Sequence, residues 1–77
     1  MKVTKIFRTI QEIQQIQYFA TQSPEQVGLQ SADGSVSVDA KSFINIFSLN
    51  FAEPIVIISE DADFFKKIDT LGVTLKD

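Results

Sequence analysis

The apolar block Ile55-Val56-Ile57-Ile58, directly after Pro54, is the feature that most constrains the fold. All four side chains are β-branched, which favours extended backbone. Successive side chains of a strand point to opposite faces of the sheet. Because all four residues are apolar, both faces of a strand formed by this block are expected to be shielded from water. The block therefore predicts a central or doubly covered strand around which the other elements are arranged.

Three further strands are predicted from shorter alternating patterns. Residues 3–8 are β-rich and roughly alternating, and residues 26–31 and 36–38 alternate again on either side of Asp33-Gly34. This dipeptide is a strong signal for a type I′ hairpin turn, because both central residues of that turn need positive φ. Residues 26–31 and 36–38 are therefore expected to pair antiparallel.

Three helices are predicted between these strands. Thr9 through Glu12 matches a capping box, and Ser23-Pro24 ends the first helix. Residues 39–50 are expected to form a short second helix. Ser59 or Asp61 caps the third helix, which Gly72 ends. The first helix carries an apolar stripe of Ile10, Ile13, Ile16, Phe19 and Ala20, and the third carries Phe64, Phe65, Ile68 and Leu71.

The resulting order is βαββαβα in a single domain, residues 1–77. Each helix has one apolar face, so the expected fold is an α+β open-faced sandwich. Its four-stranded, mainly antiparallel sheet carries three helices on one face. Residues 73–77 are left as either a frayed tail or a small added strand.

The amino-acid composition limits the kinds of metal site, catalysis and partner that we expect for this chain. The chain of 77 residues has no histidine and no cysteine and a net charge of −3. The chain therefore lacks the residues that usually bind zinc and similar metals. It also lacks the base that histidine-assisted nucleophilic catalysis requires. A nucleic-acid partner would require a basic patch. We therefore expect no metal, cofactor, enzymatic activity, nucleic acid or membrane partner, and a cytoplasmic protein.

Residues 38–49, Val-Asp-Ala-Lys-Ser-Phe-Ile-Asn-Ile-Phe-Ser-Leu, resemble the regulatory-serine segment of HPr, the phosphocarrier family of the bacterial sugar phosphotransferase system. The predicted element order is that of this family too. The resemblance implies that Ser42 is a regulatory phosphorylation site, and that Ile44 and Phe47 dock on a protein partner. Asn45 stands where the family has glycine.

The family's other hallmark, a histidine loop between the first strand and first helix, is missing. Arg8-Thr9-Ile10-Gln11 connects the two elements directly, and Thr9 takes the helix-cap position. The resemblance therefore implies a divergent HPr-like protein that cannot carry phosphate on histidine. It would be a regulatory protein-binding module whose partner is an HPr kinase or a transcription regulator.

Each of these sites has a plainer alternative. Ser42 is equally consistent with an ordinary serine that satisfies a backbone group at a helix start. Lys41 beside it is equally consistent with a solvated surface lysine. Glu60, Asp61 and Asp63 suit a helix start better than a cation site. Residues 43–51 hold more apolar side chains than one short helix buries, which predicts a contact surface for a partner or a second copy. That surface comprises Phe43, Ile44, Phe47 and their neighbours, with Thr9 and Lys41 beside it.

A second interpretation of the sequence assigns the chain to a different functional class. The same alternation of elements suits a ferredoxin-like domain that binds a small metabolite or forms a homodimer through its sheet. A sheet face rich in exposed apolar residues would favour this alternative.

Overall fold

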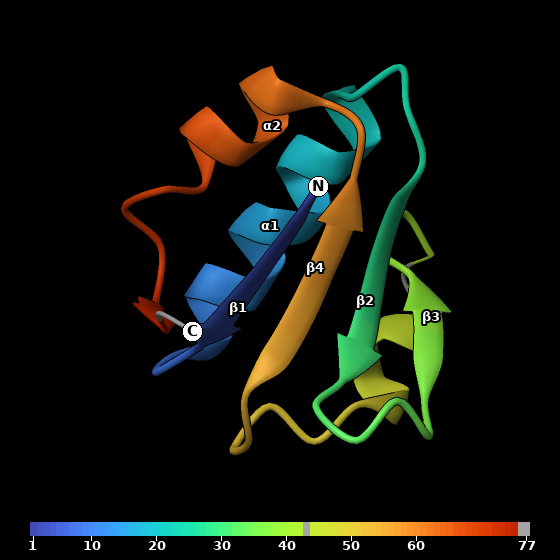
Figure 1. Ribbon diagram of the computed structural model, residues 1–77, viewed down its shortest axis with the longest axis vertical. Helices are drawn as coiled ribbons and strands as arrows, with labels where there is room; N and C mark the ends of the chain where they lie inside the picture. Colours follow the sequence, from blue (N-terminus) through green and yellow to red (C-terminus); the bar gives the residue numbers. More distant parts are fainter. Residues whose placement is uncertain (43, 76–77) are drawn as a thin grey trace.

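A computed structural model describes residues 1–42 and 44–75. Within this part the chain forms one antiparallel sheet of five strands in the order β3-β2-β4-β1-β5. The helices lie behind this sheet in the view of Figure 1, and its other face is open. The α+β class is therefore confirmed. The elements are β1 (Lys2–Ile6), α1 (Ile10–Gln22), β2 (Val27–Ser31), β3 (Ser37–Asp39), the 3₁₀-helix η1 (Asn45–Ser48), β4 (Ile55–Ser59), α2 (Ala62–Lys67) and β5 (Val73–Leu75).

Strand β4 occupies the centre of the sheet, as its apolar block predicted. It pairs with β1 on one side and β2 on the other, so that Ile57 faces Val3 and Leu29. Ile55 and Ile57 point to the helices and are 1% and 0% exposed. Val56 and Ile58 lie half-buried on the open face. Helices thus cover only one face of the strand.

Helix α1 packs on the sheet through a stripe slightly different from the predicted one. Ile13, Ile16 and Ala20 are buried, but Ile10 is 53% exposed because it lies at the very start of the helix. Gln17 is buried in its place. The buried apolar residues form one core: Phe7, Ile13, Ile16, Ala20, Val27, Leu29, Ala40, Ile46, Leu49, Ile55, Ile57, Phe64 and Ile68.

The predicted helix over residues 39–50 was wrong in type and length. In the described part of this segment, Asp39 ends β3 and the only helix is the four-residue 3₁₀-helix η1. Its preceding residue, Ile44, offers no side chain to cap the helix, and Asn45 is a weak helix former. Of the residues in η1, Ile46 alone is buried. A single buried side chain gives a longer amphipathic helix little to pack against.

The chain ends in a fifth strand, which corrects the predicted four-stranded sheet. β5 pairs antiparallel with β1, with Thr74 opposite Lys5. Lys5 lies on the helix side of the sheet and is only 1% exposed. Its ammonium donates to the carbonyls of Asp69 and Leu71, at 3.2 and 2.8 Å, and to the hydroxyl of Thr74, at 2.8 Å. All three of its donors are therefore satisfied without an acidic partner.

Glu12 holds the same C-terminal segment from the other side. Its Oε2 accepts a hydrogen bond of 2.7 Å from the backbone amide of Gly72. Lys5 thus binds carbonyls of the segment and Glu12 binds an amide. Burial lowers the pKa of Lys5, an effect that nearby Asp69 and Glu12 oppose.

The hairpin between β2 and β3 forms as predicted, but its turn is not type I′. Gly34 has a φ of 78°, whereas no described non-glycine residue has positive φ, so Asp33 does not. The amide of Gly34 donates to the carbonyl of Ser31 at 2.9 Å. The Asp33 carboxylate accepts bonds from the amide and hydroxyl of Ser35 and from the hydroxyl of Ser31. These bonds lower the pKa of Asp33 to about 2 and hold the turn.

Gly72 and Gly34 allow a matched test of the C-terminal packing. Both residues have positive φ, but a Cβ at Gly72 would lie 2.5 Å from the carbonyl oxygen of Ile6, whereas the nearest atom to one at Gly34 lies at 3.9 Å. Gly34→Ala is expected to lower the free energy of unfolding by about 1–2 kcal/mol, the cost of left-handed backbone. Gly72→Ala should lower it further, because β1 and the Gly72 turn must separate.

Urea unfolding of the two variants and the parent chain measures this difference. An equal decrease in the free energy of unfolding in the two variants would show that the contact between Gly72 and β1 does not constrain the folded chain.

Candidate partner-binding site

The start of α1 is closed by its own side chains. Thr9 is the N-cap, and its hydroxyl accepts a bond of 3.2 Å from the amide of Glu12. Glu12 Oε1 in turn accepts bonds from the amides of Arg8, at 2.7 Å, and Thr9, at 3.2 Å. The predicted capping box is confirmed. These amide bonds, that of Arg8 foremost, lower the pKa of Glu12.

A helix start with free amides is an anion site. Here a carboxylate of the chain itself occupies the amides of Arg8 and Thr9. An anion that bound those two amides would have to displace Glu12, which also holds Gly72. Glu12 therefore acts as an internal anion for these two amides.

An apolar groove of about 370 Å³ lies between this helix start and η1. We call it the α1–η1 groove. Phe47 and Ile10 on its walls are 54% and 53% exposed. Phe7 and Phe51 meet edge to face with ring centroids 6.2 Å apart. The exposed guanidinium of Arg8 lies 3.5 Å from Glu12. The groove is lined chiefly by Phe7, Thr9, Ile10, Ile13, Phe47 and Phe51.

The structure brings together two of the predicted partner-binding residues and separates the others. Thr9 and Phe47 both line the α1–η1 groove. Ile44 is 82% exposed but is not among the residues that line it. The side chain of Lys41 reaches to the carbonyl of Ser23, at 2.9 Å, near the end of α1. Phe43 lies outside the described residues.

Ser42 is half-buried and lies three residues before η1. Its amide donates to the carbonyl of Asp39 at 3.0 Å. Its hydroxyl accepts from the amide of Asn45 at 3.4 Å, which is long for such a bond. The side chain thus satisfies a backbone group only loosely. A four-residue 3₁₀-helix supplies a much weaker dipole than the longer helix that the sequence predicted.

The acidic residues near α2 behave as helix-start carboxylates. Asp61 caps α2 by accepting from the amide of Phe64 at 3.1 Å. It also accepts from the hydroxyl of Ser23 at 2.6 Å, and these bonds, that of Ser23 first, lower its pKa. Asp63 lies in the first turn. Among residues 1–42 and 44–75, no three acidic side chains are grouped to hold a metal ion.

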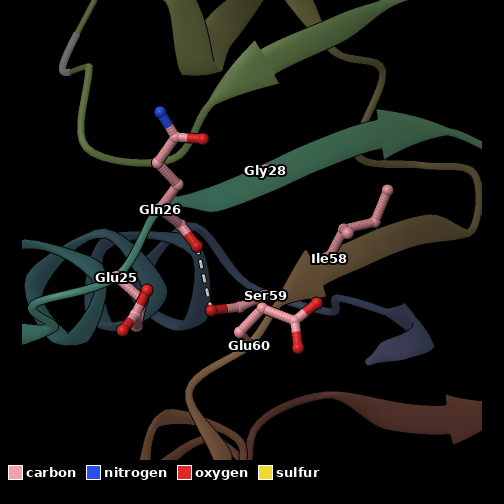
Figure 2. Close-up of a pocket in the computed structure, with 6 residues that line it drawn as sticks. All are labelled: Glu25, Gln26, Gly28, Ile58, Ser59 and Glu60. Carbon is pink, nitrogen blue, oxygen red and sulfur yellow. Dashed lines mark hydrogen bonds between the residues drawn. The ribbon is translucent and has the colours of Figure 1, made fainter.

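A pocket of about 440 Å³ lies where β2 begins and β4 ends (Figure 2). The Ser59 hydroxyl donates to the Gln26 carbonyl at 2.9 Å, so it is already satisfied. The carboxylates of Glu25 and Glu60 are the charged groups of the lining and have the same sign. This pocket has no set of converging donors that would orient a ligand.

The polar residues that hold the fold were missed at the sequence level. Lys5 lies in an alternating strand at a position that points inward. Ser23-Pro24 predicts the end of the first helix but not the bond between Ser23 and Asp61. Gln17 is absent from the predicted apolar stripe of α1 but is only 8% exposed. Its position four residues after Ile13 and three before Ala20 is the signal that places it on the inner face.

No protein-family model, curated protein or solved structure matches the chain. Within the described residues, no helix is long and apolar enough to cross a membrane.

The bond between Ser23 and Asp61 gives a test by pH. A carboxyl whose pKa is lowered by folding stabilises the fold above its unfolded pKa, and that contribution is lost as the pH falls through the folded value. Ser23→Ala should raise the pKa of Asp61 and weaken the acid dependence of stability. Ser59→Ala is the matched control, because the Ser59 hydroxyl accepts from the Asp61 amide and does not bond its carboxylate.

Carboxyl-detected NMR titration follows the Asp61 pKa directly. An unchanged value in Ser23→Ala would show that the 2.6 Å bond does not hold this carboxylate in solution.

Proposed function

We propose that the chain is a non-enzymatic, HPr-like protein-binding module, related to the bacterial sugar phosphotransferase system, that cannot carry phosphate on histidine. The observation that carries this proposal is the exposed α1–η1 groove beside a closed helix start. An apolar groove whose walls are half exposed suits a partner's apolar side chain. The closed helix start suits a protein that binds without transferring phosphate.

The relation to HPr rests on the sequence of residues 38–49, and the geometry of the groove supports the binding role. Thr9 and Phe47 are thirty-eight positions apart in the sequence, but both line the α1–η1 groove. The partner we propose is a cytoplasmic HPr kinase or a transcription regulator. Arg8 at the rim suits an acidic group on the partner next to the apolar one.

In this proposal Ser42 is the regulatory phosphorylation site. Its half-buried hydroxyl is held by a single long bond, so little is lost when it is modified. A phosphate there adds about −1.5 to −2 charge near the apolar surface that includes Ile44. The change in surface charge, and not refolding, would alter partner binding.

Incubation with ATP and a purified HPr kinase, followed by intact-mass measurement, tests both parts of the proposal. One added phosphate is expected on the parent chain and none on Ser42→Ala, with Ser48→Ala as the control at an exposed neighbouring serine. Phe47→Ala should reduce affinity for the kinase about thirtyfold, the effect of losing about 2 kcal/mol at an interface anchor. Leu75→Ala, an exposed apolar change on the opposite face of the sheet, should not.

Phosphate incorporation that persists in Ser42→Ala would exclude Ser42 as the site. Kinase binding that is equal in Phe47→Ala and Leu75→Ala would exclude the groove.

A second candidate function is supported by the open face of the sheet. Ile6, Val56 and Ile58 are half-buried there, and Val73 and Leu75 are 44% and 37% exposed. This apolar set spans β1, β4 and β5. Ile6 pairs with Val73, and Thr4 lies between Leu75 and Val56. Such a face suits a homodimer formed sheet to sheet.

Sedimentation analysis separates this candidate from the first. A sheet-mediated dimer should dissociate when Val56 is replaced by lysine, because two buried charges would face each other. Phe47→Ala should leave the dimer intact. A chain that sediments as a monomer at all concentrations would remove the second candidate.

A further inference from the structure

A second hollow, of about 360 Å³, lies on the later part of α1, apart from the α1–η1 groove. It is lined by Gln14, Gln17, Tyr18 and Thr21 of α1 and by Lys41, which approaches from the segment after β3. The four α1 residues follow helical spacing, so they share one face of α1. None of them lines the α1–η1 groove.

Gln17 supplies the observation that points to a ligand. It is only 8% exposed, and its amide nitrogen is buried with no hydrogen-bond partner among the described residues. A buried amide donor without an acceptor is costly and rare in folded proteins. Gln17 lines the hollow, so an acceptor bound there would lie beside this side chain.

Lys41 adds a cation whose position is fixed. Its ammonium donates to the Ser23 carbonyl at 2.9 Å, which holds the side chain against the end of α1. An ammonium has three donors, and this bond is the one that Lys41 makes within residues 1–42 and 44–75. The Thr21 hydroxyl already donates to the Tyr18 carbonyl at 2.6 Å. Gln14 and Tyr18 also carry donors, but both side chains are exposed and open to solvent. The donors with a defined place in the hollow are therefore the Gln17 amide and the Lys41 ammonium.

We propose that this hollow binds a carboxylate group, which the Gln17 amide and the Lys41 ammonium hold. One cation matches the single charge of a carboxylate, whereas phosphate sites usually add backbone amides at a helix start or nest. No acidic residue is among the described residues that line the hollow. The Tyr18 side chain, 60% exposed, offers a flat wall for an apolar body attached to the carboxylate.

The carboxylate belongs either to a free organic acid or to an acidic side chain of a protein partner, and one experiment distinguishes the sources. The isotope-labelled chain is titrated with benzoate, with benzamide as the neutral match, and with a capped glutamate-rich peptide, while amide NMR signals are followed. Benzoate or the peptide should shift the Gln17 side-chain amide and the Tyr18 and Thr21 backbone amides. Tighter binding of benzoate indicates a free acid, and tighter binding of the peptide indicates a partner side chain.

Two variants test the proposed donors. Lys41→Met keeps the hydrocarbon stem and Gln17→Met keeps the approximate size, and each should weaken binding of the carboxylate probe about tenfold, the effect of one charge-assisted hydrogen bond. Gln17→Met should not lower resistance to urea, because it removes a donor that has no acceptor. Lys66→Met is the control for a lysine elsewhere on the surface.

The proposal is overturned if neither carboxylate probe shifts the Gln17 amide. It is equally overturned if benzamide binds as well as benzoate, or if Lys66→Met weakens binding as much as Lys41→Met.

Discussion

The C-terminal third of the domain depends on a buried lysine, Lys5, that forms no ion pair with any of residues 1–42 and 44–75. The ammonium of Lys5 is satisfied by two carbonyls and a hydroxyl of residues 69–74. A charge in this position would be costly if even one donor were left unpaired. The loop after α2 must therefore keep its path, and that path delivers β5 to the free edge of β1.

Glu12 links the segment that Lys5 holds, residues 69–74, to the candidate binding site. One carboxylate oxygen accepts the amides of Arg8 and Thr9 at the start of α1, and the other accepts the amide of Gly72. The same side chain thus closes the helix start and fixes the turn that leads into β5. A ligand that bound the amides of Arg8 and Thr9 would therefore have to displace Glu12 and release the Gly72 turn.

Ser23 plays a similar part at the other end of α1. Its hydroxyl donates to the Asp61 carboxylate at the start of α2, and its carbonyl accepts from the Lys41 ammonium. The end of α1, the start of α2 and the segment after β3 are therefore held at one residue. This contact places the Lys41 side chain at the later part of α1. The sequence had predicted it beside the partner-binding surface that includes Ile44 and Phe47.

The sequence by itself determined the elements that rest on local or periodic signals. The central position of β4 followed from four adjacent β-branched residues, and the start of α1 followed from its capping box, because both patterns act within a few residues. Only the tertiary structure decided that residues 45–48 form a 3₁₀-helix, that residues 73–75 join the sheet, and that Thr9 and Phe47 share a groove. The added strand and the shared groove depend on contacts with residues far away in the chain. Lys5 and Gln17 show the reason most clearly: a polar side chain is buried when distant backbone groups or packing make room for it, and its own sequence neighbourhood does not record them.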